Sequence, residues 1–242
     1  MKQNEAVVLT LEKLGGQATL ADLYVEVMKV KECKWGTKTP FASIRRIVQV
    51  HPEIFKVRPG LYALRSSKKL LNLVEAEKQD SLKPEIAEQN HSYYQGLLVC
   101  IGNLRNLPTF IPNQDRNKKF LNKPLGEVRS LGVIPRFSYD SLVSRSSTVD
   151  VIWFNERGMP HSLFEVEHST DIQGALIKYS DLQDFYCNMV IVADQNRKRE
   201  YESKLSYKVF SEIKHRVKFL NYNTLVAQYQ SEVFNHNQEF SI

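Results

Sequence analysis

The chain has 242 residues and a net charge of +6, with 42% hydrophobic and 25% charged residues. This length is enough for one or two domains with a sizeable core. No apolar run approaches the length of a membrane span, and the N-terminus lacks the apolar segment of a signal peptide. Its three cysteines are far apart and lack metal-ligand spacing. We therefore expect a cytoplasmic protein with reduced thiols.

The positive charge is concentrated at the N-terminal end. Residues 1–70 carry 13 Lys and Arg against 6 Asp and Glu, a net charge of +7, whereas the remainder carries 20 against 21. A basic segment of this kind is typical of a protein that binds a polyanion such as nucleic acid. A solvated basic surface is the alternative explanation.

The first 66 residues have the pattern of a small independent domain. Thr19, with Asp22 three residues later, resembles a capping box, and Thr39 followed by Pro40 is typical of a helix start. Periodicity and turn residues predict three helices and then a β-hairpin, at residues 5–14, 19–28, 40–50, 54–57 and 61–64.

This order is that of a winged helix-turn-helix. The run TKTPFASIRRIVQVHPEIFKVRPGLYAL, preceded by GGQAT and DLY, closely resembles the HARE-HTH type of winged helix over residues 3–65. The resemblance implies a DNA-binding domain, which in bacteria is found joined to restriction-type nuclease domains. A protein-docking role is the alternative. By analogy, the residues that would contact DNA are Lys38, Ser43, Arg45 and Arg46 at the third helix and Lys56 or Arg58 on the wing.

Residues 67–90 are polar and mixed in charge, which predicts a linker, with a partly helical linker as the alternative, before a second domain at 91–242. That domain should begin with a core helix at 91–104. A strand at 109–112 and a charged loop at 115–119 follow, and prolines and glycines predict further loops through residue 147. Its last predicted elements are a strand at 188–193, a charged helix at 195–211, a strand at 217–221 and a helix at 224–230.

Acidic residues mark the centre of the second domain. Residues 149–154 and 163–167 predict two strands joined by a turn. Alternation along a strand places Glu165 and Glu167 on one face, and it places Asp150 opposite Val151 and Trp153. Three carboxylates can thus converge at one end of a sheet, where a cation would relieve their repulsion. Acidic residues on a solvent-facing strand pair are the alternative.

A helix should follow the second of these strands. Thr170 is a suitable N-cap. The apolar stripe of this helix is formed by Ile172, Ala175, Leu176, Tyr179 and Leu182.

From residue 91 the predicted order is helix, three strands, helix and strand, which resembles the αβββαβ core of the PD-(D/E)XK nuclease superfamily. The resemblance covers about residues 88–195. Asp150 matches its first acidic position, and Glu165-Val166-Glu167 matches its (D/E)-x-K tripeptide. The third position is normally lysine, and Glu167 departs from that pattern. In variant members the following helix supplies the lysine, and Lys178 is the candidate here.

The resemblance implies a mixed α/β, Mg²⁺-dependent deoxyribonuclease of the type II restriction or defence kind that cuts double-stranded DNA. Asp150 and Glu165 would bind Mg²⁺ with the Val166 carbonyl, and Mn²⁺ would substitute. Glu167 would bind a second ion or position water, and Lys178 would stabilise the transition state. His91 or Gln95 would complete the site from the first helix. A homodimer would suit two-strand cleavage. A non-catalytic DNA-binding regulator remains the alternative function.

Overall fold

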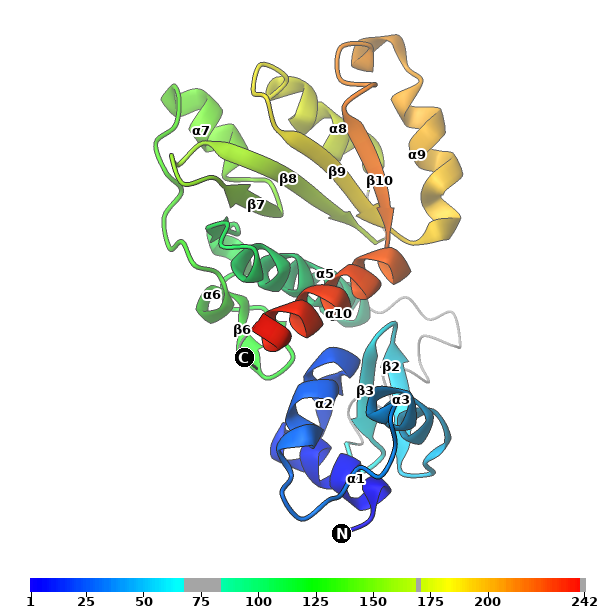
Figure 1. Cartoon of the computed structure of the whole chain (residues 1–242). Helices are drawn as coiled ribbons and strands as arrows, with labels where there is room; N and C mark the ends of the chain where they lie inside the picture. The colour runs from blue at the N-terminus through cyan, green and yellow to red at the C-terminus, as the bar shows by residue number, and fades with distance from the viewer. Residues whose placement is uncertain (68–83, 169–170, 240–242) are drawn as a thin grey trace. The chain divides into compact units, whose positions relative to one another are not determined.

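The computed structural model describes residues 1–67, 84–168 and 171–239. The chain divides into two compact units (Figure 1). The first consists of Met1–Ile86 with Tyr229–Ile242, and the second consists of Ala87–Gln228. Both contain helices and strands, so the predicted mixed α/β class is confirmed.

The first unit packs three helices against a small antiparallel sheet with strand order β1-β3-β2. Its core comes from the apolar faces of the helices, including Val7, Leu23 and Ile44, which are fully buried. In chain order its N-terminal elements are α1 (Gln3–Lys13), β1 (Gln17–Thr19), α2 (Leu20–Glu26), the 3-10 turn η1 (Val27–Lys29), α3 (Pro40–Val50), β2 (Ile54–Arg58) and β3 (Leu61–Leu64).

The predicted helices and hairpin of this unit are confirmed, with small corrections. The Thr19 hydroxyl accepts a hydrogen bond from the Asp22 N–H at 3.0 Å, which completes the predicted capping box. Thr39 does precede the first residue of α3, but its side chain makes no capping hydrogen bond. Strand β1 was not predicted, because three residues after a glycine turn become a strand only by pairing with β3.

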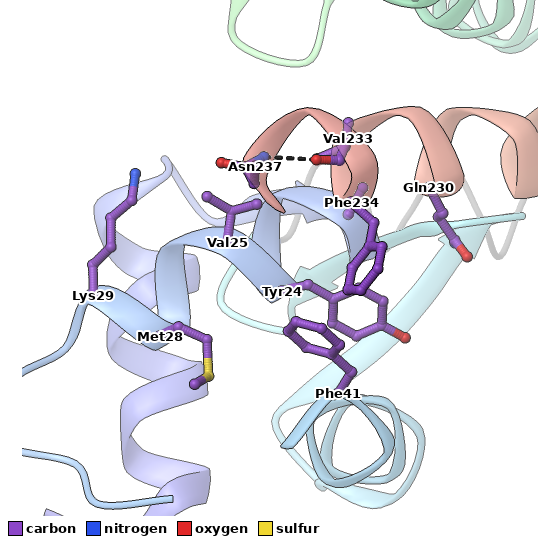
Figure 2. Close-up of a pocket in the computed structure, with 10 residues that line it drawn as sticks. Tyr24, Val25, Met28, Lys29, Phe41, Gln230, Val233, Phe234 and Asn237 are labelled. Carbon is purple, nitrogen blue, oxygen red and sulfur yellow. Dashed lines mark hydrogen bonds between the residues drawn. The ribbon is translucent and has the colours of Figure 1, made fainter. Parts of the chain in front are cut away.

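An apolar pocket of about 400 Å³ lies within the first unit, between α2, α3 and the end of α10 (Tyr222–Glu239). Figure 2 shows the rings of Tyr24, Phe41 and Phe234 side by side at this pocket. The Phe41 ring centroid is 4.8 Å from that of Tyr24 and 5.5 Å from that of Phe234. Tyr229 Oη also donates to Asp22 Oδ1 at 3.3 Å. The last helix therefore contributes side chains to the N-terminal unit, which the sequence did not indicate.

The second unit is built around a five-stranded sheet with order β10-β9-β8-β7-β4 (Figure 1). Strands β8, β9 and β10 are parallel, whereas β7 and β4 run antiparallel to their neighbours. The elements are α5 (Pro84–Leu104), β4 (Thr109–Phe110), η2 (Asn113–Asp115), β5 (Lys119–Phe120), β6 (Lys123–Pro124), α6 (Leu125–Val128), α7 (Asp140–Ser146), β7 (Val151–Phe154), β8 (Pro160–Glu167), α8 (Ile172–Asp181), β9 (Asn188–Ala193), η3 (Gln195–Arg197), α9 (Lys198–Leu205), η4 (Lys208–Phe210) and β10 (Val217–Asn221).

Helices cover both faces of this sheet. On one face, the predicted apolar stripe of α8 is buried in a core that also contains Ile152 and Leu163. On the other face, Trp153 Nε1 donates to the Leu98 carbonyl of α5 at 3.0 Å. Gly102 permits this approach, since a Cβ there would lie 2.7 Å from Trp153 Nε1. Burial on both faces holds the central strands in a fixed register.

The structure corrects several predicted boundaries. Asp150 precedes β7 instead of lying on it. The predicted charged helix at 195–211 is broken into η3, α9 and η4, and the final helix runs from Tyr222 to Glu239. Of the predicted linker, residues 68–83 lie outside the described residues, and α5 begins within it at Pro84.

The start of α8 also differs from the prediction. Thr170 lies outside the described residues, and the N-cap is Asp171, whose side chain accepts from the Gln173 N–H at 2.9 Å. Among the described helices, none has the length and apolar character needed to cross a bilayer.

Candidate active site

Three acidic side chains gather at the end of β8. Val151 of β7 pairs with Phe164 of β8, so Asp150 and Glu165 each lie one residue beyond that pair at the same end of the two strands. Glu165 and Glu167 are only 2% and 5% exposed. The expected alternation thus brings carboxylates together, but within the protein instead of on a solvent-facing sheet surface.

Asp150 is fixed by the neighbouring strand and by α5. Its Oδ2 accepts a hydrogen bond from the Val166 N–H at 2.8 Å, and it lies 3.6 Å from His91 Nε2. The contact between Val166 and Asp150 therefore runs through the backbone N–H of Val166. His91, predicted to join the site from the first helix, lies beside Asp150.

Lys178 reaches the centre from α8. Its Nζ lies 3.0 Å from Glu165 Oε1 and 2.9 Å from Glu165 Oε2, and it also donates to the Thr148 carbonyl at 2.9 Å. A lysine in contact with the buried carboxylate is therefore present, although the position after Val166 is occupied by Glu167. Lys178, the candidate lysine from the sequence, therefore lies next to Glu165.

Gln95 and Asp115 form the other flank of the site. Gln95 is fully buried, and its Nε2 donates to Asp115 Oδ2 at 2.9 Å and to the Asp150 carbonyl at 2.7 Å. Asp115 is 2% exposed and pairs with Lys118 at 2.8 Å. The first residue of the predicted charged loop at 115–119, Asp115, is therefore buried. A run of charges normally indicates a solvated segment, and only the apolar Phe110 and Ile111 a few residues before it hinted otherwise.

Ligand atoms of His91, Asp115 and Asp150 all lie within 4.8 Å of one another. This is close enough for one cation to contact the three groups. Within the described part of the chain, the donors available to a metal are therefore carboxylates with one imidazole. Carboxylates suit Mg²⁺ and Mn²⁺, and an imidazole also suits transition metals.

The electrostatics of the site favour an added positive charge. Burial raises the pKa of Glu165 well above its usual value, and the nearby Asp150 raises it further, despite the opposing effect of Lys178. Burial also raises the pKa of Asp150, although His91 counteracts it. For Lys178, burial lowers the pKa, but the charge and hydrogen bond of Glu165, together with the charges of Asp150 and Glu167, outweigh it, so the net pKa is raised. A divalent cation would stabilise the ionised carboxylates and reverse these shifts.

The residues that follow Glu165 lie at the rim of this cluster. The Glu167 carbonyl accepts from Arg197 Nη1 at 3.0 Å, which anchors the end of β8 to η3. Glu167 is close enough to Glu165 to raise its pKa. His168 Nε2 is 3.3 Å from Asn90 Nδ2 of α5. The structure therefore gathers His91, Gln95, Asp150, Glu165, Glu167 and Lys178 in one region.

The residues expected to contact DNA lie on the first unit. Lys38, Arg45, Arg46 and Lys56 are exposed, while Ser43 and Arg58 are partly buried. Arg45 Nε donates to Tyr24 Oη at 3.2 Å. Exposed cations on α3 and β2 are compatible with binding a polyanion.

The family model described as "Type II restriction enzyme NmeDI C-terminal domain" matches residues 72–240. The chain belongs to this family. The matched segment includes every residue of the acidic cluster and leaves residues 1–71 outside. As a member of the NmeDI C-terminal domain family, the chain is a restriction-enzyme-like protein.

One curated relative supports this assignment. The chain is 23% identical over 128 residues to the type II restriction enzyme NmeDI of Neisseria meningitidis serogroup C. The alignment covers 48% of this chain and 36% of that enzyme, so the chain corresponds to about a third of its relative. No solved structure matches the chain.

Proposed function

We propose that this protein is a divalent-metal-dependent endonuclease of the restriction type that hydrolyses duplex DNA. The observation that carries the proposal is the buried Glu165 carboxylate, held next to Asp150 and contacted on both oxygens by Lys178. Stability alone does not require such a group, because burying like charges is unfavourable. Membership of a restriction-enzyme family supports the same conclusion.

The carboxylate oxygens of the site suit a hard divalent cation. Asp150 and Glu165 would hold Mg²⁺, with the Val166 carbonyl as a further oxygen ligand and Mn²⁺ as a substitute. Burial raises the pKa of both carboxyls, and a bound cation would favour their ionised forms. When bound, the ion would neutralise charge on the phosphate and lower the pKa of a water molecule.

The other side chains would orient and stabilise the reacting groups. Lys178 Nζ would turn from the Thr148 carbonyl to a phosphate oxygen while it keeps its contact with Glu165. Glu167 would position the attacking water or contact a second ion. Gln95 would hold Asp150 through its carbonyl, and His91 would orient the Asp150 carboxylate.

We infer that the chain joins a winged helix to a nuclease domain, as the two family resemblances of the sequence imply. The order α5, β4, β7, β8, α8, β9 is compatible with an αβββαβ nuclease core of the PD-(D/E)XK type at residues 91–242. Three helices and a hairpin are compatible with a HARE-HTH winged helix at 1–66. Residues 67–90 would link the two, and a homodimer would allow two-strand cleavage.

A plasmid cleavage assay tests the proposal. Purified protein with Mg²⁺ or Mn²⁺ should convert supercoiled DNA to nicked or linear forms, and chelation should stop the reaction. Asp150→Asn and Glu165→Gln, which preserve side-chain size, should each lower the rate by about 10²–10³-fold, since the loss of one key transition-state contact commonly has this effect. Glu156→Gln, an exposed carboxylate in the turn before β8, is the matched control.

Equal cleavage by wild type and both variants would refute the site. DNA binding without cleavage by folded wild type, under all metals tested, would favour the alternative function of a DNA-binding regulator. Binding of Ca²⁺ measured by calorimetry gives an independent readout. It should be lost in Asp150→Asn.

A further inference from the structure

A second cavity lies at the other end of the sheet in the second unit. It has a volume of about 490 Å³ and is lined by residues at the starts of β8, β9 and β10, including Pro160, Asn188 and Lys218. These are the strand ends opposite the arrowheads in Figure 1. Glu165 is five residues further along β8, which is roughly 17 Å at about 3.3 Å per residue. The cavity is therefore separate from the acidic cluster.

The cavity has a basic lining. His161, His215, Arg216 and Lys218 surround it, and no Asp or Glu is among its described lining residues. Such a concentration of basic side chains is not a general property of this part of the chain, because residues 71–242 carry 20 Lys and Arg against 21 Asp and Glu. Lys218 and His215 are exposed, so both side chains can reach a ligand. A concave basic surface with low-dielectric walls attracts anions.

An exposed tyrosine stands on a braced loop at the same cavity. Tyr186 is 102% exposed, although large aromatic side chains are normally at least partly covered. The Arg216 guanidinium donates to the carbonyls of Gln183 and Phe185 and, at 3.4 Å, to that of Cys187.

The Phe185 ring packs edge-on against Phe137, with 5.2 Å between ring centroids. The loop is thus held from both sides of Tyr186, and the tyrosine ring is presented to solvent by a fixed backbone.

We propose that this cavity binds one nucleotide, with its base stacked on Tyr186 and its phosphate contacted by Lys218, His215 and His161. An aromatic platform beside cationic side chains is the combination that holds a single nucleotide of a strand, because every base has a stacking face and every nucleotide has a phosphate. A volume of about 490 Å³ is also in the range of small-molecule sites.

Arg216 acts as a positioning residue. Its donors hold the carbonyls of the Tyr186 loop, and no carboxylate among the described residues pairs with it, so its positive charge adds to that of Lys218. The expected source of the nucleotide is the DNA strand, and this part of the inference rests on the proposed function. A free mononucleotide would offer the same chemistry.

Binding measurements without metal test the inference. Isothermal titration of the full chain in excess chelator would use deoxyadenosine monophosphate, inorganic phosphate and a ten-nucleotide single strand as separate probes. Tyr186→Ala should weaken mononucleotide or single-strand binding by about tenfold and leave phosphate binding unchanged. Lys218→Gln should weaken the binding of every probe that the wild-type protein binds.

Matched controls are available elsewhere in the second unit. Tyr207→Ala removes another exposed tyrosine, and Lys214→Gln removes a lysine outside the cavity lining. Both should bind as the wild type does, and circular dichroism should show all four variants folded. If Tyr186→Ala loses mononucleotide binding, the site accepts free nucleotides. If the variant loses only single-strand binding, the occupant is a nucleotide of a DNA strand.

Unchanged affinity of Tyr186→Ala and Lys218→Gln for every probe would overturn the inference, as would the absence of any nucleotide or strand binding by wild type. The result is independent of the cleavage test, because Asp150→Asn should retain this binding. If Asp150→Asn cleaves DNA normally while Tyr186→Ala loses nucleotide binding, the proposed active site fails and the nucleotide site stands.

Discussion

Replacing Lys178 with methionine should destabilise the protein, because it leaves the buried carboxylate of Glu165 on β8 without a positive partner. Lys178 Nζ makes the contacts with both oxygens of Glu165, and Glu165 is 2% exposed. Methionine fills a similar volume and favours a helix, so the main loss is the positive charge. Removing one partner of a buried ion pair typically costs about 3–5 kcal/mol, because the remaining charge is left uncompensated.

Protonation of Glu165 should limit that cost at low pH. Burial and Asp150 already raise its pKa well above the usual value, and the loss of Lys178 would raise it further. A carboxyl with a raised folded-state pKa binds a proton that the unfolded chain has released. Stability therefore falls as pH rises above about 4.3, by up to about 1.4 kcal/mol per pH unit, until the folded-state pKa is passed. The difference between variant and wild type should be larger at pH 8 than at pH 5.

Urea unfolding at the two pH values, followed by circular dichroism in excess chelator, measures this effect. The double variant Glu165→Gln/Lys178→Met should recover most of the lost stability at pH 8, because it removes both charges. Lys198→Met breaks a surface pair with Glu202 whose atoms are 3.8 Å apart, and it should change stability by less than about 0.5 kcal/mol. A loss below about 1 kcal/mol in Lys178→Met at pH 8, or no recovery in the double variant, would refute the reasoning.

Three further results are expected. Gly102→Ala should cost about 1–3 kcal/mol in urea unfolding, because its Cβ would lie 2.5 Å from Thr109 Cγ2, whereas Gly174→Ala, with open space around the new Cβ, should not destabilise by contact. Burial raises the pKa of the Cys187 thiol to about 11, so alkylation followed by mass spectrometry should be slow at pH 8 and faster toward pH 10; a fast reaction at pH 8 would contradict this. Arg46→Ala should weaken duplex binding similarly across sequences and reduce the salt slope by about 1, whereas an unchanged slope would remove Arg46 from the interface.

Local patterns were enough to predict most elements of the chain. Apolar spacing placed α8 and its buried stripe, and the Thr19–Asp22 pair marked the start of α2. Alternation put Glu165 and Glu167 on one face of β8. These features depend on neighbours a few residues away, and helix and strand periodicity expresses them directly in the sequence.

Other features depended on contacts between distant segments. Asp115 lies in a charged run, yet it is buried beside Gln95, which is 20 residues away. Asp150 is held by the Val166 N–H only because β7 and β8 pair in one register.

The sequence by itself determined which carboxylates share a strand face, and it offered Lys178 as a candidate lysine. Only the tertiary structure brought Lys178 to Glu165, buried the carboxylates of Glu165 and Glu167, and assembled the basic cavity around Tyr186. The physical reason is that side-chain direction follows from local backbone geometry, whereas burial and charge proximity follow from strand register and helix packing, which no short stretch of sequence encodes.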